Sequence, residues 1–217
     1  MSTTSAERPN TRKARAAETR RRLVQAAVDQ FSERHYDDVA VSDIAESAGV
    51  AHGLLFHYFD SKRGIYLEAM HEAARELDFV DTVPPDLPAG RQFRQYLESH
   101  VGYLARHRGL ALRLVRGGRG SDPEAWEMFE AARRHTMEWL CSLLGLDPHS
   151  EAIQMMLRSV SAAFDEITIY WLEHGQIFDV SAIVDEIVAL TITCLQAAER
   201  LDPSLNVAAA VRKLRRV

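Results

Sequence analysis

The sequence is poor in cysteine and lacks any long uninterrupted run of apolar residues. Its two cysteines, Cys141 and Cys194, lie far apart in the 217 residues. Each has an apolar helical context, which predicts reduced, buried thiols and disfavours a disulfide or redox switch. No apolar run reaches the ~18 residues that a membrane span requires, and MSTTSAERPNTRKAR at the N-terminus lacks the apolar core of a secretory signal. These absences predict a cytoplasmic protein with no membrane partner.

The sequence also lacks strand-like alternation and the fingerprints of common enzymes. It has no nucleophile elbow, Walker loop or dinucleotide fingerprint, and RGGRG (116–120) follows no strand, which favours a hinge loop. His52 and His57 are five residues apart and do not share a helix face, which disfavours a zinc pair. Glu68 and His71 form half of a di-iron motif that has no second half. We therefore predict no enzyme activity, no catalytic residue, no metal and no cofactor.

Charge is distributed unevenly along the chain. The composition, 47% hydrophobic and 26% charged, predicts a soluble globular protein. The net charge of −5 argues mildly against nucleic-acid binding. However, residues 1–22 hold seven Arg or Lys against two Glu, whereas the chain from Gly64 onward holds 16 basic and 22 acidic residues. The positive charge gathered at one end predicts an anionic partner for that end.

Helical spacing of apolar residues is the dominant pattern. Two segments rich in proline and glycine interrupt it, DTVPPDLPAG (81–90) and RGGRGSDP (116–123), the second with Asp122 and Pro123 as a typical helix start. The sequence therefore predicts an all-α protein. Helical segments are expected around 23–31, 42–48, 49–59, 61–77, 93–104, 123–144, 150–174 and 181–201.

The last two predicted helices are apolar on more than one face. Along 150–174, Ile153, Leu157 and Phe164 share one face, while Met155 and Ile169 crowd another. A helix that is apolar all round is buried all round. Since these helices end a small protein, a second copy of the chain is the expected cover, and we predict a homodimer through the last two long helices.

The segment VSDIAESAGVAHGLLFHYFD (41–60) has the pattern of a helix-turn-helix. Ala45 supplies the small residue where two helices cross, and Gly49 tolerates the left-handed backbone of the turn. Flanking apolar residues would lock the crossing. An ordinary helical hairpin in a core is the alternative, which the basic arm and the short helices disfavour. The apolar residues of the pattern are Ile44, Ala48, Val50, Leu55 and Tyr58.

The sequence resembles the tetracycline-repressor (TetR) family of transcriptional regulators over about residues 15–70. AGV at the turn and the ending HYFDSK are the most specific parts of the resemblance. It implies an N-terminal three-helix DNA-binding unit, followed by a larger helical ligand-binding and dimerisation bundle, about nine helices in all. It also implies that a dimer inserts one helix per subunit into the major groove of a palindrome, and that a small molecule in the body releases the DNA. We expect a flexible basic arm (1–17), a DNA-binding domain (18–63) and a ligand-binding domain (64–217).

The resemblance and the local chemistry together predict the DNA contacts. Arginines near a helix start oppose the helix dipole, and phosphate would explain them. Residues at the start of the second motif helix would approach base edges, with apolar contacts to thymine methyl groups. The family's usual Ser or Thr is missing at Ala40, so Ser42 either caps that helix or contacts a phosphate. Phosphate contacts are predicted for Arg20, Arg21, Arg22, His57, Tyr58 and Lys62, and base contacts for Ala51, His52, Gly53, Leu54 and Phe56.

The C-terminal body is where an effector is expected to bind. Asp165 and Glu166 interrupt an otherwise apolar run. A buried carboxylate requires a partner, which could be a ligand, an arginine such as Arg133, or a group across the dimer; simple exposure is the remaining alternative. The candidate ligand-binding residues are His100, Trp126, Phe129, Arg133, Phe164, Glu166 and Tyr170, and their apolar character favours a largely hydrophobic effector.

We therefore predict a homodimeric, ligand-responsive regulator that represses transcription from a palindromic operator. Two alternatives stay open from the sequence. A helical-bundle enzyme would hold a stoichiometric metal or other cofactor, and a protein-interaction module would bind its partner without dependence on salt. The operator sequence, the regulated genes and the effector's identity do not follow from the sequence.

Overall fold

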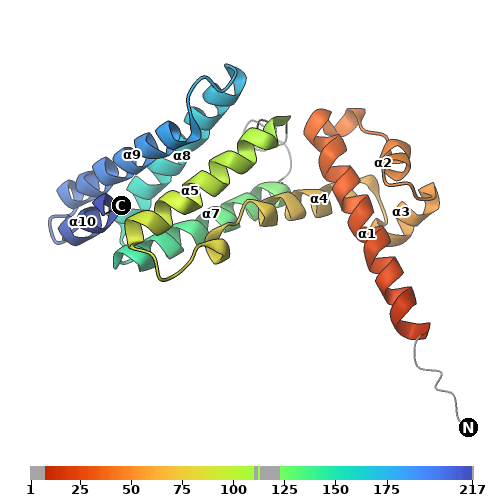
Figure 1. The fold of residues 1–217 in the computed structure, drawn as a ribbon, viewed down its shortest axis with the longest axis horizontal. Coiled ribbons are helices and arrows are strands. Elements are labelled where there is room, and N and C mark those ends of the chain that lie inside the picture. The colour runs from red at the N-terminus through yellow and green to blue at the C-terminus, as the bar shows by residue number, and fades with distance from the viewer. Residues whose placement is uncertain (1–7, 110–111, 113–122, 217) are drawn as a thin grey trace, which may run out of the picture. The chain divides into compact units, whose positions relative to one another are not determined.

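The computed structural model describes residues 8–109, 112 and 123–216, and within these ranges all regular structure is helical (Figure 1). The predicted all-α class is confirmed. The described α-helices are α1 (Arg8–Glu33), α2 (Val41–Ser47), α3 (His52–Phe59), α4 (Lys62–Glu76), α5 (Ala89–Arg106), α7 (Pro123–Leu144), α8 (Glu151–Glu173), α9 (Val180–Leu201) and α10 (Ala208–Arg215). The chain divides into two compact units, Met1–Ala73 and Ala74–Val217. The predicted boundary after residue 63 falls near the start of α4.

The first unit holds the helix-turn-helix, formed by α2 and α3. Gly49 has φ 63°, the left-handed backbone that the sequence predicts at the turn. The N–H of Gly49 donates to Glu46 O at 2.9 Å, and that of Val50 donates to Ala45 O at 3.0 Å. This pair of bonds is the Schellman motif, which satisfies the last carbonyls of α2. Leu55 is fully buried on the inner side of α3. The turn and the core behind it therefore fix the direction in which α3 projects.

Helix α1 is much longer than the sequence predicts. It begins at Arg8, so residues 8–17 are helical where a flexible arm was expected. Residues 12–17 are all Arg, Lys or Ala, which are good helix formers even without an apolar stripe. Residues 20–22 therefore lie in the middle of α1, where the dipole argument made for them does not apply.

The helix cap proposed for Ser42 is also wrong. The N-cap position of α2 is Ala40, which has the extended backbone of a cap and no side-chain hydrogen bond. Ser42 lies one residue inside the helix, and its hydroxyl donates to the Asp43 carboxylate at 3.3 Å. An N-cap residue must stand outside the helix with non-helical backbone angles, and Ser42 lies two residues after the N-cap position Ala40, too late to cap α2.

In the second unit, α8 and α9 lie side by side along their length, with α5 against α9, and α10 closes the end near α5 and α7 (Figure 1). The ends of α7, α8 and α9 agree closely with the prediction. The Ser150 hydroxyl caps α8 by accepting from the Ile153 N–H. α10 was not predicted, because only three of its eight residues are buried. The predicted hinge at 117–120 and the predicted cap Asp122 lie outside the described residues.

α9 is the one described helix that is long and apolar enough to cross a membrane. Seven of its residues, including Ile187 and Leu195, are buried inside the second unit. A core helix of a soluble bundle has the same length and composition.

Candidate DNA-binding surface and effector cavity

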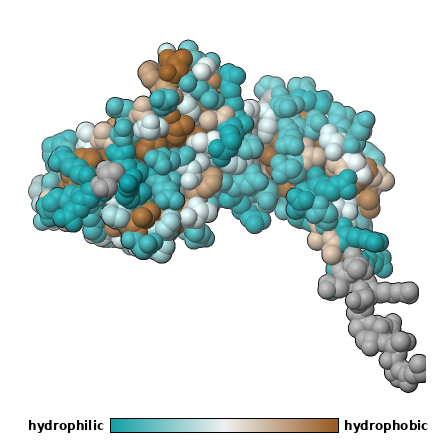
Figure 2. Space-filling view, in the orientation of Figure 1, coloured by the Kyte–Doolittle hydropathy of each residue, from teal (hydrophilic) through white to brown (hydrophobic). Residues whose placement is uncertain are grey.

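The face of α3 that points to solvent carries the residues predicted to contact bases. Leu54 and Phe56 are exposed by 37% and 42%, which is high for large apolar side chains. The surface over α3 accordingly shows hydrophobic residues at the right-hand edge of Figure 2. Leu55 and Phe59, on the opposite side, are buried in the core of the unit. The predicted base-contacting residues Ala51, His52, Gly53, Leu54 and Phe56 are all exposed.

Aromatic and histidine rings along α3 lie in pairs. The ring centroids of His52 and Phe56 are 5.3 Å apart, and those of His57 and Tyr58 are 5.2 Å apart. Tyr58 is half-buried and His57 is exposed, so the histidine offers its polar atoms to solvent. No heavy atom lies within 4 Å of the place where a Cβ of Gly53 would sit. The protein's own packing therefore does not require glycine there, and the surface beside it is open.

Arg22 has a different environment from the one that the sequence predicts. Its guanidinium donates to Ala48 O and, at 3.3 Å, to Gly49 O. These two carbonyls belong to the turn between α2 and α3. Arg22 therefore ties α1 to the turn, and at least part of its donor capacity is used inside the protein.

The other predicted phosphate-binding cations also have partners within the first unit. Arg20 pairs with Glu68 at 2.7 Å and lies over the Phe59 ring at 5.3 Å. Arg21 pairs with Glu18 at 2.7 Å, three residues earlier on the same helix. Both arginines stay more than two-fifths exposed, so a phosphate could still compete for them.

Lys62 is held at the start of α4. Its Nζ lies 4.5 Å from the centre of the Tyr36 ring and donates to Asp37 O at 3.3 Å. Ser42, on α2, is exposed as well. Three further cations, Arg12, Lys13 and Arg15, are exposed on the first half of α1. The sequence assigned them only to a basic arm, because nothing local showed that they stand on a helix.

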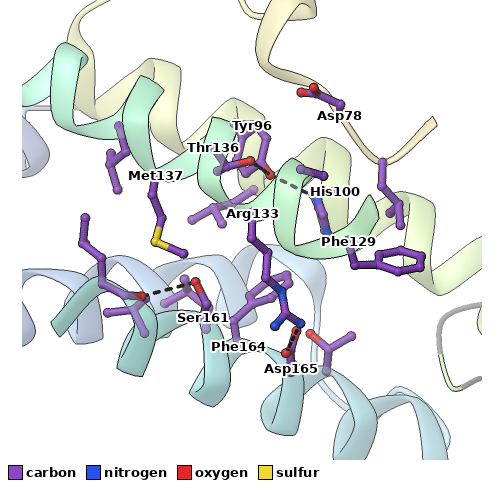
Figure 3. A pocket seen from close by; sticks show the side chains of 18 of the residues that line it. Asp78, Tyr96, His100, Phe129, Arg133, Thr136, Met137, Ser161, Phe164 and Asp165 are labelled. Atoms are coloured by element: carbon purple, nitrogen blue, oxygen red, sulfur yellow. Dashed lines mark hydrogen bonds and ion pairs between the residues drawn. The ribbon is translucent and has the colours of Figure 1, made fainter. Parts of the chain in front are cut away.

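A cavity of about 150 Å³ lies in the second unit, among α5, α7 and α8 (Figure 3). Of the seven predicted ligand-binding residues, His100, Trp126, Phe129, Arg133 and Phe164 line it. Most of the remaining lining is apolar: Ala74, Leu77, Phe93, Leu97, Leu104, Ala132, Met137, Leu140, Leu157, Val160 and Ile187. These residues were not singled out from the sequence, because apolar residues at helical spacing have the same pattern whether they fill a core or line a cavity.

The other two predicted residues, Glu166 and Tyr170, do not line this cavity. Glu166 is exposed, one position and about 100° round the helix from Asp165. Tyr170 is 57% exposed and stacks on His174, with ring centroids 3.9 Å apart. Asp165, by contrast, faces the cavity and Arg133 (Figure 3).

The polar groups from α5 are neutral at physiological pH. The Tyr96 hydroxyl lies 3.3 Å from His100 Nδ1 and 3.0 Å from Thr136 Oγ1. Burial disfavours the imidazolium and lowers the pKa of His100 to about 4, against a smaller opposing effect of a hydrogen bond to the Leu77 backbone. Burial likewise raises the pKa of Tyr96 to about 12. These groups therefore offer the cavity hydrogen bonds without charge.

The charged groups between α7 and α8 form a closed network. Arg133 binds Asp165 through one terminal nitrogen and Glu130 through the other, the latter at 3.2 Å. Arg158 donates to the second oxygen of Glu130 at 3.3 Å. Burial raises the pKa of Asp165, and the positive charge and hydrogen bond of Arg133 oppose that rise. Of the alternatives left open for the two carboxylates, Asp165 is thus a structural pair of Arg133 and Glu166 is exposed.

The first unit has a helix-turn-helix whose second helix exposes an apolar face, and the second unit holds a cavity. These two features together are typical of a DNA-binding regulator with a ligand-binding body. Residues 23–69 match the family model described as bacterial regulatory proteins, tetR family. The first unit therefore carries a DNA-binding domain of this family, and the chain as a whole is similar to transcriptional regulators. Its relatives are regulators and not enzymes.

Two relatives illustrate the extent of the similarity. The fatty acid metabolism regulator protein of Bacillus subtilis (strain 168) is 23% identical over 186 residues, which cover 79% of this chain and 92% of the relative. The HTH-type transcriptional regulator BetI of Klebsiella pneumoniae is 34% identical over 84 residues, 38% of this chain and 43% of BetI. The similarity to BetI therefore extends over less than half of either protein.

Solved structures share the fold over most of the chain. A tetR-family transcriptional regulator from Streptomyces coelicolor has a TM-score of 0.79 at 22% identity and covers 91% of this chain and 88% of its own. FadR from Bacillus subtilis, solved in complex with stearoyl-CoA, has a TM-score of 0.65 at 20% identity, with 79% and 96% covered. At these identities the likeness concerns the fold.

Proposed function

We propose that the protein is a homodimeric repressor that binds a palindromic operator and leaves it when a small hydrophobic effector binds the second unit. The exposed face of α3 carries this proposal: Leu54 and Phe56 expose apolar area in the position where a helix-turn-helix meets the major groove. The domains would be those expected from the sequence, a DNA-binding domain at 18–63 and a ligand-binding domain at 64–217. Residues 8–17 would form the first turns of α1 in place of a flexible arm. The protein would act in the cytoplasm, where its DNA lies.

Base preference would come from the apolar face of α3. Leu54 and Phe56 can contact thymine methyl groups, and the open surface at Gly53 lets the backbone approach a base edge. His57, Tyr58, Ser42, Lys62, Arg20 and Arg21 would contact phosphates, together with the exposed cations of the first half of α1. Contacts of this second kind set position and affinity but do not select a sequence.

Homodimer formation would use the outer faces of α8 and α9. Met155 and Tyr170 on α8 and Leu201 on α9 are each more than half exposed. At the turn joining these helices, Ile177 and Phe178 are exposed by 67% and 56%, and a hydrophobic patch is visible there at the top of Figure 2. Apolar area of this kind supports a protein interface. A twofold dimer would space its two α3 helices for half-sites one turn of DNA, ~34 Å, apart.

The effector would bind the cavity with an apolar group. A cavity of about 150 Å³ equals the roughly 150 Å³ of an engineered apolar cavity that binds benzene. Two FadR proteins that share the fold were solved with stearoyl-CoA and lauroyl-CoA. This supports acyl-CoA thioesters as the first compounds to test, with part of the acyl chain in the cavity. Binding would release DNA only to the extent that the effector prefers the DNA-free conformation.

Selection of bound sequences from a random DNA pool tests the DNA-binding half of the proposal. We expect enrichment of a palindrome whose binding weakens steeply with salt. Neutralising Arg12, Lys13 and Arg15 should weaken binding about equally on all sequences, whereas Leu54→Ala or Phe56→Ala should change the preferred sequence. If no sequence is enriched and the partner is another protein, the interaction-module alternative holds; a stoichiometric metal in the purified protein would favour the enzyme.

A further inference from the structure

Thr168 on α8 has an unusual environment within the cavity. Its side chain lines the cavity and is 1% exposed, yet its hydroxyl has no hydrogen-bond partner among the described residues. Two other helical hydroxyls donate to their own helix: the half-buried Ser161 to Leu157 O at 3.2 Å, and the buried Thr191 to Ile187 O at 2.7 Å. A buried hydroxyl without a partner is destabilising. The cavity therefore contains one polar group that folding alone leaves unsatisfied.

The charged groups of the cavity, by contrast, all have partners. Arg133 is bound by Asp165 and Glu130. Asp78 accepts from the Val80 N–H at 3.2 Å, and its other oxygen lies 2.9 Å from His135 Nδ1. An anionic ligand group beside Arg133 would add a third negative charge next to Asp165 and Glu130 at a largely buried site, which is unfavourable. An uncharged ligand group adds no such charge.

We propose that Thr168 is a specificity-determining residue that hydrogen-bonds an oxygen on an uncharged, mainly apolar part of the effector. A thioester, ester or ketone carbonyl would accept from the hydroxyl, and an alcohol could donate or accept. The inference rests on the proposed function only in taking the cavity as the effector site. It distinguishes two effectors that carry the same hydrocarbon tail, because an acyl-CoA presents an uncharged thioester carbonyl whereas a free fatty acid presents a carboxylate.

The test measures binding of matched probes to the full-length protein and three variants by isothermal titration calorimetry. The probes are 2-octanone, octanoate and octanoyl-CoA. Thr168→Val removes the hydroxyl at almost constant shape, and Thr168→Ser retains it. Thr191→Val is the control, because this buried threonine lies outside the cavity and its hydroxyl has a partner. We expect the wild type to bind 2-octanone or octanoyl-CoA more tightly than octanoate.

For these uncharged-oxygen probes, Thr168→Val should weaken binding by about two- to tenfold, the effect of one neutral hydrogen bond. Thr168→Ser should restore most of the affinity, and Thr191→Val should leave it unchanged. Tighter binding of octanoate, equal affinity of wild type and Thr168→Val, or no binding of 2-octanone and octanoyl-CoA up to their solubility would each overturn the proposal. If octanoate binds best and releases DNA, the inference fails but the proposed function stands. If the protein binds no DNA while the Thr168 variants behave as expected, the inference stands but the proposed function fails.

Discussion

At the scale of single residues, Arg22 shows how a cation can support DNA binding from inside the protein. Its guanidinium bonds two carbonyls of the turn, Ala48 O and Gly49 O, that the Schellman bonds leave available. The neighbouring Arg21 pairs with Glu18, on the same exposed helix face. The three arginines cannot be told apart in the sequence, because the partners of Arg20 and Arg22 are 48 and 26 residues away and are brought close only by the fold.

Replacing Arg22 with Ala should lower the free energy of unfolding by about 1 kcal/mol, the usual worth of such hydrogen bonds at a partly exposed site. It should also weaken binding to all DNA sequences, since the turn that orients α3 loosens. Arg21→Ala is the matched control and should leave stability almost unchanged, as expected for a fully exposed ion pair. Chemical denaturation and gel-shift assays measure both effects. Equal stability of the two variants would contradict the structural role of Arg22.

The buried His100 predicts a loss of stability in mild acid. Its pKa is lowered to about 4 in the folded protein, whereas the unfolded chain has the ordinary value near 6.5. Below pH 6.5 the unfolded state therefore binds a proton that the folded state does not, and stability falls until pH 4. Between pH 7 and pH 5 the loss should be about 2 kcal/mol.

His100→Gln, which cannot take up the proton, should remove this part of the pH dependence. The measurement is the free energy of unfolding by urea at both pH values. The exposed His149 offers the control variant His149→Gln. A wild-type and a His100→Gln protein with the same change in stability between pH 7 and pH 5 would show that His100 titrates normally in the folded state.

At the scale of elements, helix ends were predictable where a local signal exists. Pro123 and Ser150 mark the starts of α7 and α8, and Gly49 ends α2, because each residue acts through its own backbone or a nearby N–H. The start of α1 at Arg8 and the presence of α10 were not predicted. The first half of α1 lacks the apolar stripe that reveals a helix, and the stripe of α10, Ala210, Val211 and Leu214, is only about one turn long.

The docking of α10 makes Gly90 at the start of α5 a sensitive position. A Cβ at Gly90 would come within 2.8 Å of both Lys213 O and Leu214 O, so the backbone of α10 would have to move. Gly90→Ala should therefore destabilise the second unit by about 1–3 kcal/mol, the usual cost of overpacking. Thermal unfolding followed by circular dichroism measures this loss.

Gly53→Ala on α3 is the control with the opposite expectation. Its Cβ would meet no atom within 4 Å, so the substitution should raise stability by up to about 1 kcal/mol, as alanine does in a helix. It should also weaken operator binding if the backbone approaches the DNA there. A destabilised Gly53→Ala, or a Gly90→Ala as stable as the wild type, would contradict the packing described for these two helices.

At the scale of the whole molecule, we propose that DNA binding and effector binding belong to separate compact units, and recognition of a palindrome would require a dimer. The candidate cavity was predictable in part. Five of the seven named residues line it. Glu166 and Tyr170 could not be excluded from the sequence, since the exact rotation of a helix that is apolar on several faces is set by its neighbours.

Disrupting the outer face of α8 and α9 should separate the subunits without unfolding them. Leu201→Arg places a charge on a residue that is 56% exposed in the single chain, so the fold should tolerate it. In the dimer the same charge would be buried, which costs several kcal/mol. We expect a monomer by light scattering and loss of operator binding. Asp86→Arg, on an exposed loop, is the control and should remain a dimer.

The most direct test of an effector-released repressor is the fluorescence anisotropy of the selected palindrome, titrated with protein and then with octanoyl-CoA. We predict saturable binding of a dimer per palindrome, weakened steeply by salt, and a return of the anisotropy to that of free DNA as octanoyl-CoA occupies the cavity. Substituting a bulky Trp for Ala132 in the cavity lining should abolish this release while leaving DNA binding intact. Anisotropy that is unchanged by any acyl-CoA, or lowered equally in Ala132→Trp, would contradict release through this cavity.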